Sequence, residues 1–111
     1  MITFKVKAGK NSQIKLVYKD QYGSVINISG ATAVLVAREG FYTSVLVEVV
    51  GTIIGAEGQI TFDFVPSDTA DVLVDKVEKR LLCDVELTLS TGEKLDLFDE
   101  VELLVKQSAV R

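Results

Sequence analysis

Acidic side chains are the residues of this chain most able to do chemistry. Asp96, Asp99, Glu100 and Glu102 fall within seven consecutive positions near the C-terminal end. Such a group could supply the several oxygen ligands that Ca²⁺ takes, although the spacing of a helix-loop-helix calcium site, with its glycine, is absent. We therefore interpret the group as a solvated acidic edge, which also discourages aggregation between sheet edges.

Three further aspartates, Asp68, Asp71 and Asp75, follow Pro66. A helix N-terminus favours acidic residues, and this preference explains the first two positions. Paired carboxylates can also cleave glycosidic bonds, and the spacing of the carboxylates in the sequence does not exclude that chemistry. Sites of that kind usually lie in clefts lined by aromatic side chains, whereas only 7% of the residues here are aromatic and none is tryptophan.

Other catalytic residue types are missing. The chain has no histidine, which removes the commonest general base near neutral pH, the Ser-His-Asp and Cys-His arrangements and most zinc ligand sets. Gly51, Gly55 and Gly58 precede a predicted strand rather than a helix, so they do not match a phosphate-binding loop. We predict that the chain is not an enzyme and has no catalytic residues, no cofactor and no metal site.

Phe41 and Tyr42 are the candidate partner-binding residues, adjacent to each other in a predicted loop. Aromatic side chains at a loop tip can anchor a partner protein. The alternative is that one of them folds back over the open end of the fold. The single cysteine, Cys83, cannot form an internal disulfide, and its apolar neighbours indicate a buried small hydrophobe rather than a reactive thiol.

Charge is spread unevenly along the chain. The formal net charge is −4, so we expect no affinity for nucleic acid. Residues 1–20 carry five lysines and one acid, whereas residues 57–102 carry thirteen acids and four basic residues. Either the basic first strands lie beside the acidic last strands and neutralise them, or the molecule is dipolar and stacks with copies of itself as a homo-oligomer.

The elements that position these residues are predicted to be strands, because apolar and polar residues alternate with a period of two through most of the chain. Segments of this extended pattern cover residues 2–8, 13–19, 24–28, 31–38, 44–50, 59–65, 79–89, 94–98 and 100–106. Turns are predicted at residues 20–23 and 90–93, where Gly23 and Gly92 tolerate a positive φ. No apolar run approaches the roughly 18 residues of a membrane helix, and no signal-peptide stretch begins the chain, so we expect no membrane contact.

The predicted fold class is all-β: an immunoglobulin-like antiparallel β-sandwich of seven to eight strands with one short helix near residues 67–75. A length of 111 residues and the absence of a linker predict one domain, residues 1–111. The alternation predicts one shared core that contains Leu35, Ile60, Phe62, Phe64, Val85 and Leu87.

Four segments of the chain, residues 30–38, 58–70, 83–94 and 101–111, resemble a family of phage structural domains. The family is that of the N-terminal domains of baseplate upper proteins from phages of Gram-positive bacteria. The sequence pattern of the family has three parts. A strand begins with Gly-Ala-Thr and ends in Arg, and a later alternating strand is followed by Ser-Asp-Thr-Ala. A third, acidic strand ends in a Gly-Glu-Lys turn. Where this family often has Gly-Tyr the chain has residues 79–81, Lys-Arg-Leu, which favours a docking role over recognition of a host receptor.

The resemblance implies a non-enzymatic structural or assembly module of a phage or prophage tail, associated with the baseplate or a fibre. Its implied partners are other phage structural proteins, and further copies of the chain are a second possibility. It would be made in the host cytoplasm and then built into the virion, either as a free-standing component or as a domain of a longer protein. The alternative function is a carbohydrate-binding or adhesion β-sandwich module.

Overall fold

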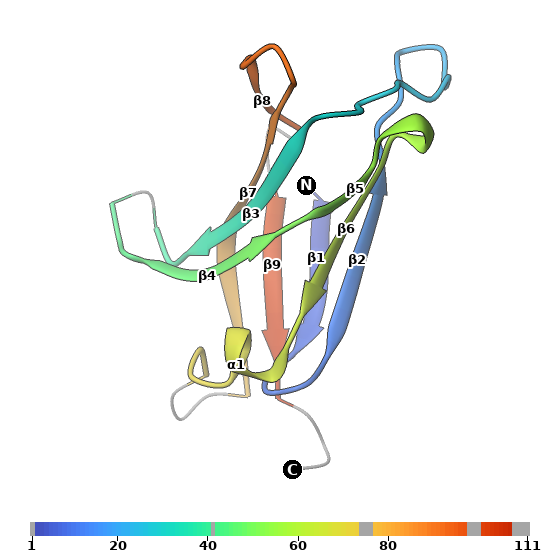
Figure 1. The fold of residues 1–111 in the computed structure, drawn as a ribbon. Helices are drawn as coiled ribbons and strands as arrows, with labels where there is room; N and C mark the ends of the chain where they lie inside the picture. The colour runs from blue at the N-terminus through green and yellow to red at the C-terminus, as the bar shows by residue number, and fades with distance from the viewer. Residues whose placement is uncertain (1, 41, 74–76, 98–100, 108–111) are drawn as a thin grey trace.

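The computed structural model describes residues 2–40, 42–73, 77–97 and 101–107. These residues form nine strands, one short α-helix and one turn of 3₁₀ helix (Figure 1). The strands are β1 (Ile2–Lys7), β2 (Ser12–Val17), β3 (Thr32–Arg38), β4 (Val45–Val50), β5 (Thr52–Ile54), β6 (Gln59–Phe64), β7 (Glu78–Thr88), β8 (Lys94–Asp96) and β9 (Val101–Lys106). The helices are η1 (Gly55–Glu57) and α1 (Pro66–Thr69).

The strands make two sheets, which confirms the predicted all-β sandwich. The larger sheet has the order β1-β9-β7-β3-β4, with β8 also paired to β7, and the smaller sheet has the order β2-β6-β5. Figure 1 shows the smaller sheet lying across the larger one. β7 is the long central strand of the larger sheet, as its eleven residues allow it to pair with β9 along one half and β8 along the other.

One pairing departs from the predicted antiparallel arrangement, because β1 pairs with β9 in parallel. A turn at residues 8–11 carries the chain from β1 directly into β2 of the other sheet. β1 therefore has no hairpin partner within its own sheet. Because the chain turns into the other sheet after β1, the strand beside β1 is the distant strand β9, which runs in the same direction.

The apolar core fills the space between the two sheets. All six of the predicted core residues are at most 2% exposed and belong to one cluster. Ile60, Phe62 and Phe64 come from β6 of the smaller sheet, and Leu35 comes from β3 of the larger one. Because side chains in a strand alternate between faces, burial of these residues also fixes which residues of each strand point outward.

Gly51 lies where one extended segment leaves the larger sheet and enters the smaller one. β4 ends at Val50 and β5 begins at Thr52, and the Gly51 N–H donates to the carbonyl of Ala33 at 2.8 Å. A β-carbon on Gly51 would lie 3.0 Å from a ring carbon of Phe62 and 3.1 Å from a methyl of Ile60. A larger residue here would therefore press on the core at the corner of the sandwich.

One sequence prediction is wrong in detail. Residues 24–28 do not form a strand: they contribute a single bridge between Lys19 and Val25. The N–H of Ile28 instead donates to Gly55 at 2.9 Å, so this segment crosses from one sheet to the other. The short helix predicted near residues 67–75 is present as the four-residue helix α1, and residues 74–76 lie outside the described residues.

Helix α1 is tied by hydrogen bonds to the turn between β1 and β2 at one end of the sandwich. Asp68 stabilises its start, since the Asp68 carboxylate accepts a hydrogen bond from the Val65 N–H at 2.8 Å. Thr69 is completely buried, and its hydroxyl accepts from the Gly9 N–H at 3.0 Å. Val72, just after the helix, is buried in the core.

Replacing Gly51 with alanine should lower the free energy of unfolding by about 1–3 kcal/mol, because the new methyl group overpacks a filled core. Gly40→Ala is the matched control, since its β-carbon would meet only a methyl of Thr43, at 3.7 Å. Urea denaturation of both variants and the parent measures the difference. If Gly51→Ala were as stable as Gly40→Ala, the proposed crowding at the corner would be wrong.

Candidate functional site

The predicted aromatic anchor is described only in part. Tyr42 is fully exposed, so this residue does not fold back over the sandwich. Phe41 lies outside the described residues. The loop around them is held by Thr43, whose hydroxyl accepts from the Gly40 N–H at 2.9 Å, and by an ion pair between Glu39 and Lys79.

The acidic residues are dispersed over the fold. Within the described ranges no group of three or more Cys, Asp or Glu side chains could hold a metal ion. Glu102 accepts hydrogen bonds from Arg80 at 2.7 Å and from Thr3 at 3.3 Å, so it is part of the larger sheet's surface network. Asp75, Asp99 and Glu100 are outside the described residues.

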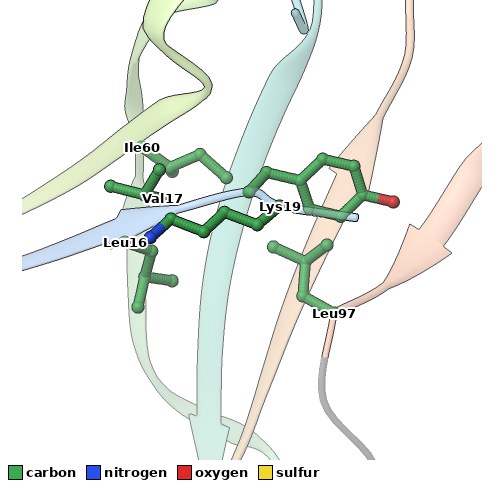
Figure 2. A pocket seen from close by; sticks show the side chains of 6 residues that line it. Leu16, Val17, Lys19, Ile60 and Leu97 are labelled. Carbon is green, nitrogen blue, oxygen red and sulfur yellow. The ribbon is translucent and has the colours of Figure 1, made fainter. Parts of the chain in front are cut away.

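A pocket of about 230 Å³ opens beside the end of β2. Its lining is mostly apolar and comes from both sheets: Leu16, Val17, Tyr18, Lys19, Ile60 and Leu97. Figure 2 shows Leu97 on the opposite side of the pocket from Leu16 and Val17. The lining contains no carboxylate and no nucleophile paired with a base, so it can accommodate an apolar group but offers no evident catalytic pair.

The outer face of the larger sheet, the face that points away from the core, carries several exposed or half-buried apolar side chains. Val34 and Val36 on β3 are only half-buried, and Val50 on β4 is 72% exposed. Leu82, on the central strand β7, is 38% exposed. Apolar side chains gathered on one face and bordered by charge are typical of a protein-contact surface.

Acidic side chains border these residues without a counter-ion. Glu86 and Asp96 are direct cross-strand neighbours in the β7–β8 pair, and like charges placed opposite each other destabilise a sheet. Asp84 and Glu48 lie on either side of Val36 in register. Among the described residues, none of these four acids forms an ion pair. A partner that supplied positive charge would remove this repulsion.

Sequence reasoning did not single out this surface. The residues that compose it are far apart in the chain and meet only through the register of β3 with β4 and β7. One signal was present in the sequence: residues 31–37 are apolar apart from Thr32, so a strand formed by them is apolar on both faces. The structure places Val34 and Val36 on an outer face that the chain itself covers only in part.

No ion pair between described residues joins a lysine of the first twenty residues to an acid of the second half. β1 lies beside β9, where Lys5 is opposite Leu104 and Lys7 is opposite Lys106. The two ion pairs found between described residues, Glu39–Lys79 and Arg80–Glu102, include none of these lysines. The basic first strand therefore lies beside the last strand, but within the described ranges no ion pair joins the two.

Cys83 is buried, as its apolar neighbours predicted. It lies on the core face of β7, opposite Ala37 and Val101. Burial, and to a smaller extent the negative charge of Asp84, raises the pKa of its thiol to about 12. Because the thiolate is the nucleophilic form, a thiol of this kind packs in the core and does no chemistry near neutral pH.

The raised pKa makes stability depend on alkaline pH. The unfolded chain ionises this thiol near pH 8.5, whereas the folded chain retains the proton up to about pH 12. The stabilisation is complete below the unfolded pKa and is lost as pH rises above it. The parent should lose about 1.4 kcal/mol per pH unit more than Cys83→Ala between about pH 9 and 11. Urea denaturation measures the slopes, and equal slopes would show that the thiol reaches solvent.

No helix in the described part of the chain is long and apolar enough to cross a membrane. No protein-family model matches the chain, and no curated protein is significantly similar to it. The resemblance to phage baseplate domains is therefore an interpretation of the residues alone.

Proposed function

We propose that this chain is a non-enzymatic structural module of a phage or prophage tail, associated with the baseplate or a fibre, that works through protein–protein contacts. The observation that carries the proposal is the outer face of the larger sheet. Exposed Val50 and Leu82 lie there among the carboxylates of Glu48, Asp84 and Glu86, which have no ion-pair partner within the described ranges. Exposure of such a face to water lowers the stability of an isolated molecule, and a partner that covers the face removes this unfavourable free energy.

The phage tail is the proposed setting because residues 30–38, 58–70 and 83–94 resemble phage baseplate domains. In that setting the partners are other virion proteins, and the chain passes from the host cytoplasm into the tail. The carbohydrate-binding alternative gains no support from the described aromatic side chains. Tyr22 and Tyr42 are exposed, but their loops lie on opposite sides of the molecule (Figure 1), so they do not form one stacking platform.

Particles from the phage or prophage that encodes the chain test the proposal directly. Mass spectrometry of purified tails should find the chain in fixed proportion to other tail proteins, and deletion of its coding sequence should reduce infectious particles. Absence of the chain from tails, together with normal particle yield after deletion, would contradict the proposal.

A surface variant tests whether the outer face makes the contact. Val50→Glu should lower incorporation into tails at least tenfold, because the variant places a charge in a contact from which water is excluded. A tenfold decrease corresponds to a loss of about 1.4 kcal/mol of binding free energy. Ile54→Glu is the matched control: Ile54 is 47% exposed, but on the smaller sheet. Equal incorporation of the two folded variants would show that the contact surface lies elsewhere.

A further inference from the structure

We propose that the edge strand β2 binds an extended segment of a partner protein, which joins the smaller sheet as a further strand. The bound segment carries acidic side chains on its outward side and apolar side chains on its inward side. This inference goes beyond the proposed function, because it assigns a contact surface separate from the outer face of the larger sheet. Three observations along β2 support it: an unpaired strand edge, an apolar pocket beside that edge and lysines that border it.

The sandwich is closed at the turn between β1 and β2 and opens with distance from that turn. Near the turn the core-facing side chains of both strands are buried, with Val6 3% and Ile14 8% exposed. Farther from it, Phe4 and Leu16 are only half-buried, and Ile2 at the start of β1 is 42% exposed. Apolar side chains on the core side of both strands therefore stay partly in contact with water, which a covering strand would exclude.

The edge of β2 on this side has free backbone groups. The Tyr18 N–H donates to the Gly58 carbonyl at 2.7 Å, and this pair continues the register of β2 with β6. Hydrogen-bonded positions alternate along an antiparallel pair, so the backbone N–H and C=O groups of Lys15 and Val17 point away from β6. β2 is the last strand of the smaller sheet, and no strand in the described part of the chain pairs with this edge. Such an edge can pair with a strand from another protein.

The apolar pocket lies against the same edge. Residues 16–19, which are consecutive in the chain, all line it. Because side chains of an extended chain alternate between faces, one pocket reaches four consecutive residues only along the edge. Leu97 bounds the opposite side, where its N–H donates to the Val85 carbonyl at 3.0 Å (Figure 2). The volume of about 230 Å³ exceeds that of a cavity of about 150 Å³ that binds benzene, so the pocket can take a leucine or phenylalanine side chain.

Lysines border the edge on the side that faces solvent. Lys15 and Lys19 are exposed on the outward side of β2, and Lys5 is exposed on β1. The two ion pairs found between described residues include none of these lysines. Lysine at a strand edge discourages pairing with neutral or basic strands. The same positive charge favours a strand that carries acidic side chains.

Two acids close to these lysines already accept hydrogen bonds from other groups. Asp63, opposite Gln13 on β6, accepts a hydrogen bond from the Gln13 side-chain amide at 2.8 Å. Asp20 accepts from the backbone N–H groups of Tyr22 and Ser24 at 2.8 and 3.0 Å. Acidic side chains from a partner are therefore the complementary charge for this edge.

The alternation of β2 defines the sequence pattern of the bound segment. Side chains directly opposite each other on paired strands point to the same face. Residues opposite Leu16 and Tyr18 therefore point inward, toward the pocket, and should be apolar. Residues opposite Lys15 and Lys19 point outward and should be acidic. The recognised pattern is acid, apolar, any residue, apolar, acid, and it is the same for either direction of the bound strand.

A peptide with this pattern, acetyl-Ser-Glu-Leu-Val-Leu-Glu-Ser-amide, tests the proposal when its fluorescently labelled form is titrated with the full chain. Its anisotropy should rise to saturation. A second peptide with serine in place of both leucines should bind at least tenfold more weakly, because it leaves the pocket empty. A third peptide with lysine in place of both glutamates should also bind at least tenfold more weakly, because like charges then face each other.

Charge reversal on the protein gives the reciprocal test. The double variant Lys15→Glu, Lys19→Glu should lose affinity for the glutamate peptide at least tenfold and bind the lysine peptide instead. The matched control is Lys10→Glu with Lys94→Glu, which makes the same change of net charge at exposed residues away from the β2 edge and should bind as the parent does. Thermal melting verifies that both double variants are folded.

Amide hydrogen exchange, measured by NMR, locates the bound strand. The Val17 N–H should exchange more slowly when the glutamate peptide is bound, because it gains an acceptor, whereas the Tyr18 N–H already donates to Gly58 and should change less. A parent that does not bind the peptide, equal binding of the serine peptide, or unchanged exchange at Val17 on saturation would each overturn the proposal. Tighter binding of a labelled single-stranded oligonucleotide than of the glutamate peptide would also overturn it, since the lysines would then be assigned to nucleic acid.

Discussion

The apolar layer between the two sheets is the constraint on which the other features depend. Ile60 and Phe62 of the smaller sheet and Leu35 of the larger one are fully buried in it. A strand cannot slip by one residue without moving its whole buried set into water. The core therefore fixes the register of every strand that contributes to it. The same register decides which side chains face outward, and so the composition of the proposed interface is a consequence of how the core packs.

The period-two alternation of the sequence predicted which side of each strand is buried, but not which strands lie next to each other in the sheets. Residues 59–65 and 79–89 alternate so regularly that both the strand and its buried side were evident, and β6 and β7 follow that prediction. The turn glycines Gly23 and Gly92 both have positive φ, as expected. The parallel pairing of β1 with β9 was missed, because alternation within one strand contains no information about the direction of the strand beside it.

Two other errors arose where the local preference of the residues did not decide the conformation. The strand change at Gly51 was not predicted: no strand was assigned to the segment with three glycines in eight residues, whereas β5 is a short strand that continues the path of β4. Residues 24–28 look extended because Val25 and Ile26 are β-branched. Their backbone groups bond to Tyr18 and Gly55 instead of a strand ladder. In both places long-range hydrogen bonding decided between conformations that local preference leaves close in energy.

The interface was harder to predict than the fold for a related reason. Tyr42 attracted notice because aromatic residues in loops often bind partners, and its exposure keeps that hypothesis open. Outward residues of strands look like ordinary solvated positions when each is considered alone. Glu86 and Asp96 are ten residues apart in the chain, and only the β7–β8 register shows that they repel each other. A surface built from several strands becomes visible only after the topology is known.

Thiol protection at the centre of the larger sheet tests the account most directly. Leu82→Cys, in a Cys83→Ala background, places a reactive thiol on the outer face of the larger sheet, and Ile54→Cys places one of similar exposure on the smaller sheet. In assembled tails a maleimide should label the Leu82→Cys protein at least tenfold more slowly than the Ile54→Cys protein, because a partner covers the outer face, whereas the two free proteins should react at similar rates. Equal rates in the tails would contradict the claim that the outer face of the larger sheet is where this chain binds its partner.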